Sequence, residues 1–119
     1  MKKRNLIISW ILRVLTALGF LVASLGKLTQ NSEVVKMFEN WGFPDGFYFI
    51  IGILELLLAV LLLAPKTLKT AIIGLVLIMI GAMITHFIND PISQLIRPII
   101  FLGLLLTIYY FNYPKSIFR

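Results

Sequence analysis

The chain has 119 residues, enough for one domain, and is 60% hydrophobic with only 13% charged residues. Its mean hydropathy of +0.98 is too high for a soluble domain of this size and indicates a membrane protein. The absence of cysteine excludes disulfide exchange, thiolate–zinc sites, iron–sulfur ligation and lipoprotein anchoring. The net charge of +6 lies largely outside the apolar runs, and its placement argues against nucleic acid as a partner.

Four apolar runs are predicted to be helices, over residues 6–26, 47–64, 68–88 and 91–111. Each is close to the roughly 20 residues that cross a hydrocarbon core of about 30 Å. Helix is expected because it satisfies its own backbone in lipid. Asp90 followed by Pro91 is typical of an N-cap and a first helical position. The expected fold is an all-α, four-helix transmembrane bundle, with residues 1–119 as a single domain.

The segment between the first two apolar runs is predicted to contain a short amphipathic helix over residues 32–41. Asn31 or Ser32 would cap it. Its apolar residues recur at the spacing of one helix face: Val34, Phe38 and Trp41. Such a helix lies in the membrane interface, either as a lid over the mouth of the bundle or as a surface for a partner helix.

The basic residues predict the orientation. If both termini are cytoplasmic, seven Lys and Arg residues fall on the inner side and two on the outer side. The inner set is Lys2, Lys3, Arg4, Lys66, Lys69, Lys115 and Arg119, and the outer set is Lys27 and Lys36. We therefore expect a multi-pass protein of a bacterial inner membrane. The N-terminal run is similar to a signal peptide, but Arg13 interrupts it and further spans follow, so it is expected to be retained.

Arg13 and Glu55 lie inside predicted spans, where an unpaired charge is costly. At a rise of about 1.5 Å per residue, they lie roughly 10 Å and 13 Å inside the same boundary. The sequence therefore predicts a buried Arg13–Glu55 ion pair between the first two long helices. Whether that pair is structural or functional stays open.

Lys27, His86 and Arg97 fall in the outer half, under an aromatic rim that includes Trp41 and Tyr48. This pattern favours a basic mouth that binds an anionic or carbonyl-bearing amphiphile, such as a quinone head group or a lipid phosphate. For each basic residue a structural role is the alternative to ligand binding.

In those structural roles, Lys27 extends its ammonium to the interface. Arg97 satisfies carbonyls freed at a Pro98 kink. The single histidine excludes a bis-histidine haem within one chain, and no metal site is expected. No nucleophile–base–acid set, phosphate-binding loop or pair of catalytic carboxylates is apparent, so an autonomous enzyme is not predicted.

Three segments, residues 12–28, 40–65 and 72–87, resemble the DoxX family and its DoxX-like relatives, which are small four-helix bacterial inner-membrane proteins. The resemblance depends on the order and spacing of short motifs. These are Arg13, Gly26 with Lys27, Trp41–Gly42 with Pro44, Gly52 with Glu55, and Gly81–Ala82 with Thr85–His86.

The family takes its name from a membrane subunit of a thiosulfate:quinone oxidoreductase, and other members are linked to redox-stress complexes. The resemblance thus implies a non-catalytic membrane subunit that binds a quinone or similar lipid for a redox partner. The thiol chemistry of cysteine-containing relatives is not implied. Two alternatives stay open. One is a structural or chaperone-like bundle that binds other membrane proteins or a second copy of itself. The other is a small proton-coupled transporter with Glu55 as proton acceptor.

Overall fold

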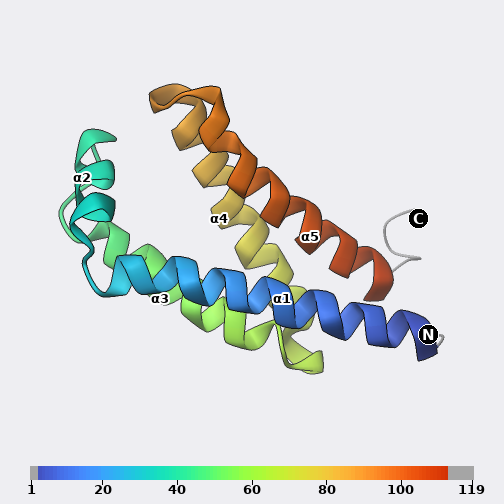
Figure 1. Ribbon diagram of the computed structural model, residues 1–119. Helices are drawn as coiled ribbons and strands as arrows, with labels where there is room; N and C mark the ends of the chain where they lie inside the picture. Colours follow the sequence, from blue (N-terminus) through green and yellow to red (C-terminus); the bar gives the residue numbers. More distant parts are fainter. Residues whose placement is uncertain (1–2, 113–119) are drawn as a thin grey trace.

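The computed structural model describes residues 3–112, and these residues are helical apart from short connections (Figure 1). The elements are α1 (Lys3–Leu28), α2 (Ser32–Asn40), α3 (Phe47–Leu61), the 3₁₀ turn η1 (Pro65–Thr67), α4 (Leu68–Asn89), the 3₁₀ turn η2 (Ile92–Leu95) and α5 (Ile96–Asn112). The expected all-α fold is confirmed over these residues.

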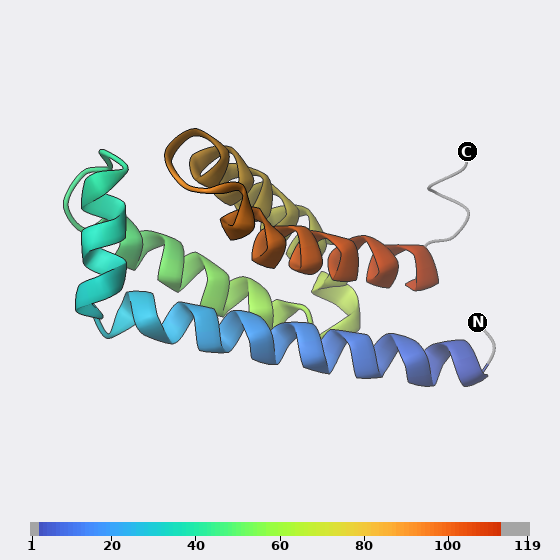
Figure 2. The same cartoon turned by 45° about the horizontal axis from the view of Figure 1, so that its top comes forward.

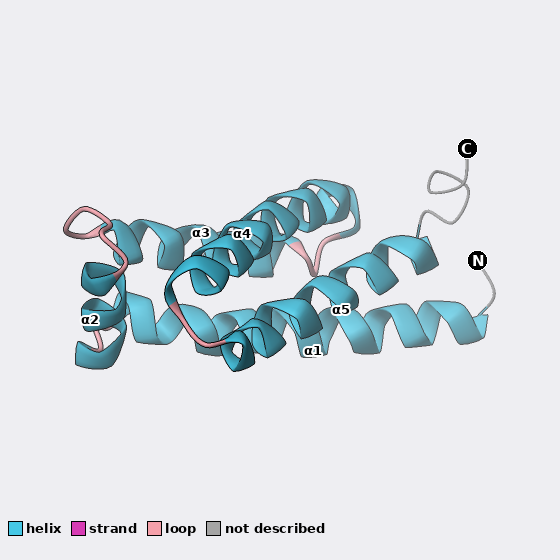
Figure 3. Cartoon of the chain, turned by 90° about the horizontal axis from the view of Figure 1, so that it is seen from above, coloured by secondary structure: helices cyan, strands magenta, loops and turns pink. Residues whose placement is uncertain are grey.

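The long helices form two antiparallel pairs, α1 with α3 and α4 with α5 (Figures 1 and 2). The pairs converge along the first half of α1, beside which η1 joins α3 to α4, and we call this the η1 end. They diverge toward the opposite end, where α2 lies across the ends of α1 and α3 (Figure 3). We call this the α2 end. The divergence leaves room between the two pairs near α2.

Three helical stretches are long and apolar enough to cross a membrane: Lys3–Leu28, Pro65–Asn89 and Ile92–Asn112. α3 is also apolar but has only 15 residues. Large aliphatic side chains cover the outside of these helices; Val22, for example, is 70% exposed and Leu77 is 64% exposed. Such surfaces are stable in lipid and would be unfavourable in water.

The core lies where the two helix pairs meet. Phe20 is fully buried on α1, and its ring centroid lies 4.6 Å from that of Phe101 on α5. Gly19 makes this approach possible, because a Cβ there would come within 2.6 Å of the Phe101 ring. Gly74 on α4 likewise admits Leu58 of α3. Small residues thus let the helices pack closely, as is usual in membranes.

The chain between α4 and α5 differs from the prediction. Asp90 is the C-cap of α4 and has an extended backbone, so it is not the N-cap of the last helix. The η2 turn follows, and α5 begins only at Ile96. Pro98 therefore lies in the first turn of α5, where backbone N–H groups have no intrahelical partner, and the expected loss of a hydrogen bond at Pro98 does not arise.

The other helix bounds differ by smaller amounts. α1 begins at Lys3 and ends at Leu28, beyond both predicted limits, whereas α3 ends at Leu61. α2 spans Ser32–Asn40, and the Asn31 side chain accepts a hydrogen bond from the backbone N–H of Glu33 at 2.9 Å. This is ordinary N-capping by asparagine.

A candidate ligand cavity between the helix pairs

A cavity of about 520 Å³ occupies the space between the helix pairs near the α2 end. Its walls are mostly apolar side chains of α3 and α4, with Lys27 from α1 and aromatic residues from α2 and the following loop. The lining consists of Lys27, Phe38, Trp41, Phe43, Phe47, Ile51, Glu55, Leu77, Ile78, Met79, Gly81, Ala82, Ile84, Thr85 and His86. A volume of this size and an apolar wall with few polar groups are typical of small-molecule sites.

Lys27 and Glu55 form an ion pair in the wall of this cavity. Lys27 Nζ lies 2.7 Å from Glu55 Oε1, and the two side chains are 18% and 2% exposed. Gly52, one turn from Glu55 on α3, allows the stem of Lys27 to lie against the helix. A Cβ at Gly52 would come within 2.9 Å of Lys27 Cβ. The close contact of α1 with α3 thus sets the position of the pair.

The predicted ion pair between Arg13 and Glu55 is wrong, because Glu55 pairs with Lys27. Side chains on a helix lean toward the N-terminus of that helix. On antiparallel helices Lys27 and Glu55 therefore lean toward each other, whereas Arg13 and Glu55 lean apart. The prediction compared only the depths of Arg13 and Glu55 in the membrane, and depth does not show in which direction a side chain leans.

Arg13 instead forms its contacts at the η1 end of the bundle. Its Nε donates a hydrogen bond of 2.9 Å to the carbonyl oxygen of Leu62, the C-cap residue of α3, and its guanidinium lies 3.7 Å from the centre of the Trp10 ring. Ser9 and Asn112 make a further polar contact at this end, where the amide of Asn112 donates to the Ser9 hydroxyl at 2.8 Å. Carbonyls at the end of a helix lack intrahelical partners, so Arg13 has a structural role here.

A second polar group closes the α2 end. His86 Nδ1 lies 2.8 Å from Asp90 Oδ2, and the indole N–H of Trp41 donates to the same oxygen at 3.0 Å. The rings of Trp41 and His86 meet edge to face, with centroids 5.1 Å apart. Because Asp90 belongs to the end of α4 and Trp41 to the end of α2, this hydrogen bond joins the two halves of the molecule across the cavity.

Four aromatic rings cover the cavity on this side, and we call them the aromatic roof: Phe38, Trp41, Phe43 and Phe47. Phe38 lies at the centre of the roof and is only 8% exposed. Its ring centroid is 5.1 Å from that of Trp41 and 5.7 Å from that of Phe43, and Phe43 stacks on Phe47 at 4.7 Å. Tilted and offset contacts at these distances are favourable for aromatic pairs.

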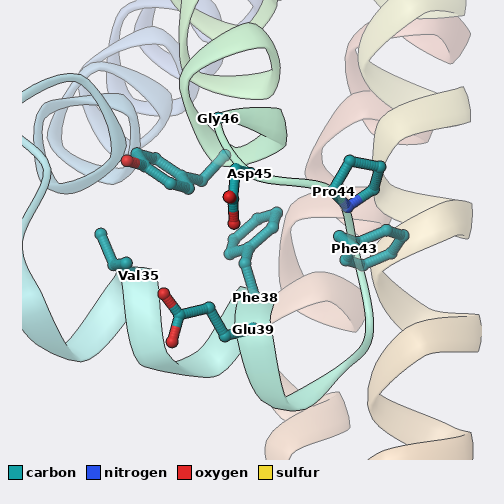
Figure 4. A pocket seen from close by; sticks show the side chains of 8 residues that line it. Val35, Phe38, Glu39, Phe43, Pro44, Asp45 and Gly46 are labelled. Atoms are coloured by element: carbon teal, nitrogen blue, oxygen red, sulfur yellow. The ribbon is translucent and has the colours of Figure 1, made fainter.

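Two residues expected at this site lie elsewhere. Tyr48 lines a smaller cavity of about 220 Å³, which shares Phe38 and Phe43 with the first one and also includes Glu39 and Asp45 (Figure 4). Arg97 is exposed on α5, a helix that contributes no residue to the large cavity. Of the residues expected to bind ligand, Lys27, Trp41 and His86 line the large cavity together.

The predicted basic mouth is therefore corrected as well. Lys27 faces Glu55 and His86 faces Asp90, so each basic side chain of the site has a carboxylate beside it. Whether His86 is neutral or protonated, the four groups together carry no net positive charge. Among residues 3–112, no group of three His, Cys, Asp or Glu side chains could hold a metal ion.

The sequence placed Asp90 near the basic residues of the outer half but did not place Glu55 in this site. The spacing of Asp90 four residues after His86 was a usable signal, because residues i and i+4 of a helix are neighbours. Glu55 lies three residues after Gly52, on the same face of α3. Phe43 and Phe47 belong to the aromatic residues expected at the outer rim, but their packing on Phe38 depends on the path of the loop.

Helices with long apolar exposed faces and a mostly apolar internal cavity define an integral membrane protein of the all-α class. A sequence model of the DoxX-like family matches residues 11–108, and the chain belongs to that family. Comparisons with curated proteins and with solved structures gave no match.

Proposed function

We propose that this DoxX-like protein is a non-catalytic subunit of a bacterial inner membrane that holds a quinone or similar neutral lipid for a redox partner. The cavity at the α2 end is the proposed site. The observation that carries the proposal is an apolar cavity of about 520 Å³ with a buried ion pair in its wall. Apolar walls can bind the ring and the hydrocarbon chain of a quinone, and a few polar groups can fix the orientation of its head group.

The charges favour a neutral head group over a lipid phosphate. A phosphate is best held by unpaired basic groups, especially Arg. In this cavity Lys27 is already paired with Glu55, and Arg97 lies outside. The Lys27 ammonium has three N–H donors and needs only one for Glu55, so another can donate to a ligand carbonyl. The roof excludes water from that contact.

The proposed topology has four crossings with both termini cytoplasmic, and α3 as the shortest crossing. The basic residues Lys66 and Lys69 belong to η1 and the start of α4, which lie in the half of the molecule that contains the start of α1 (Figure 1). The acidic residues of α2, Glu33 and Glu39, lie at the other end. This segregation follows the positive-inside rule.

Cysteine labelling tests the topology, and the chain has no cysteine of its own. In intact cells a cysteine at Glu39 is expected to react with a membrane-impermeant thiol reagent, whereas one at Lys66 is expected to react only after the cells are opened. Both residues are exposed, so the difference reports the side of the membrane. Labelling in the opposite sense would reverse the topology.

Filling the cavity tests the proposed site. Gly81 lines it, and a Cβ built there meets nothing within 4 Å. Gly81→Phe should therefore occupy the cavity without strain in the helix packing. We expect at least about a tenfold loss of co-purified quinone or lipid per protein, equivalent to about 1.4 kcal/mol of binding free energy. Mass spectrometry after extraction in mild detergent measures it.

Gly103→Phe is the matched control. Gly103 also has open space around its Cβ position but lies on α5, away from the cavity. This variant should keep the bound lipid and the same thermal unfolding profile. Equal lipid retention in both variants would contradict the proposed site.

A small proton-coupled transporter is the second candidate, because the buried Glu55 carboxylate lies in the wall of a cavity. Intramembrane carboxylates often mark proton pathways. Proton-coupled flux in liposomes that is lost in Glu55→Gln, with the fold retained, would favour transport over lipid holding.

A further inference from the structure

We propose that the ligand enters the cavity sideways from the bilayer, between α3 and α4, and that the site selects an amphiphile with one chain and a small neutral head. The head lies beside Lys27 and Glu55, and the chain leaves past Leu77 and Ile84. This inference rests on the proposed function and adds the route and the shape of the ligand.

The α4 edge of the cavity is open to lipid. Leu77 and Ile84 both line the cavity, yet they are 64% and 56% exposed on the outside of the bundle. They are seven residues apart, or about 10 Å along the helix, and lie on nearly the same face. Two aliphatic side chains that contact the cavity and the bilayer together form an apolar passage.

Packed side chains bound the cavity at its two ends. The aromatic roof covers the α2 end, and the Trp41–Asp90 hydrogen bond of 3.0 Å ties it to α4. Below the cavity, toward the η1 end, the buried ring of Phe20 packs on Phe101 at 4.6 Å. Leu75 of α4, fully buried in the core, fills the space toward the η1 end.

The size and charge of the cavity restrict the ligand. A volume of about 520 Å³ holds one drug-sized group, so most of a long chain must lie outside. A second chain would have to pass the same edge. The paired charges of Lys27 with Glu55 and His86 with Asp90 leave no free cation for an anionic head. Together these features favour a ring with carbonyl or hydroxyl oxygens on a single chain.

The test compares two probes on the protein in lipid nanodiscs. One is a benzoquinone with a ten-carbon chain, and the other is the same ring with a methyl group in place of the chain. Quenching of tryptophan fluorescence reports binding, because Trp41 lines the cavity. Stopped-flow mixing gives the association rate of each probe.

Narrowing the passage is expected to slow only the probe with the chain. In the double variant Leu77→Phe/Ile84→Phe its association rate should fall about tenfold, and the rate of the methyl probe should change less than about twofold. Ile73→Phe/Ile80→Phe is the matched control, because Ile73 and Ile80 are exposed on α4 but do not line the cavity. It should behave as the parent.

One outcome separates the route from the site. An unchanged association rate of the chain-bearing probe in Leu77→Phe/Ile84→Phe would overturn the lateral route while the binding site itself survives. Absence of quenching by both probes in the parent would overturn the proposed function and this inference together.

Discussion

Replacing Lys27 with methionine is expected to lower the free energy of unfolding by about 3–5 kcal/mol, because it leaves a buried carboxylate without its partner. Glu55 is 2% exposed, and its ion pair with Lys27 is 2.7 Å long. Methionine keeps the volume of the lysine stem, so the loss reports the charge rather than packing. Unfolding in detergent, followed by circular dichroism, measures it.

Removing the acidic partner instead, in Glu55→Gln, is expected to lower the free energy of unfolding by less. The Lys27 side chain is 18% exposed and lies at the last turn of α1, so its ammonium can extend to water when the carboxylate is gone. The double variant should lose clearly less than the sum of the two single losses, because neither charge is then left alone. Additive losses would mean that the two side chains do not interact.

Arg13 provides the control for this cycle. Arg13→Gln should also destabilise the protein, because it removes the donor to the Leu62 carbonyl. The losses of unfolding free energy in Arg13→Gln and Glu55→Gln should add to within about 0.5 kcal/mol in the double variant, as they do for independent sites. A coupling larger than that between Arg13 and Glu55, with none between Lys27 and Glu55, would favour the pairing predicted from sequence.

The membrane character and the helical class follow from composition, because long apolar runs leave few alternatives. The ion-pair partner of Glu55 does not follow, because it depends on the register of α1 against α3 and on the lean of each side chain. Lys27 was recognised as a basic residue of the outer half, and Glu55 as a buried acid. What the sequence lacked was the close approach at Gly52 that brings them together.

The α4–α5 connection shows a second limit. Asp90 before Pro91 suits an N-cap, and that local preference is real. In the structure, however, the Asp90 carboxylate is placed beside His86 and Trp41, and the next α-helix starts six residues later at Ile96. A contact with Trp41, 49 residues earlier in the chain, decides the conformation, and no local pattern contains it. Tyr48 was misplaced for the same reason, since the loop path puts it beside the smaller cavity.

Removing the Trp41 indole should open the cavity to water. The reporter is a cysteine at Ala82, which lines the cavity in a chain with no other cysteine. In nanodiscs, Trp41→Ala/Ala82→Cys should react with a charged maleimide at least about tenfold faster than Ala82→Cys alone. A tenfold change corresponds to a fall of about 1.4 kcal/mol in the free energy needed to open the roof to water. Mass spectrometry of the labelled protein follows the rate.

Trp10→Ala is the matched control, because it removes the other tryptophan of the chain, which lies beside Arg13 at the η1 end. It should leave the labelling of Ala82→Cys unchanged. Trp41→Phe retains a ring in the roof but has no N–H to donate to Asp90, so its labelling rate should be intermediate.

Asp90→Ala should raise the labelling rate of Ala82→Cys about as much as Trp41→Phe does, because each substitution removes the same hydrogen bond. For that reason the double variant Trp41→Phe/Asp90→Ala should raise the rate by no more than the larger of the two single changes. Additive effects would show that Trp41 and Asp90 act independently and not through their shared hydrogen bond. An unchanged labelling rate in Trp41→Ala would show that the roof does not keep water from the cavity.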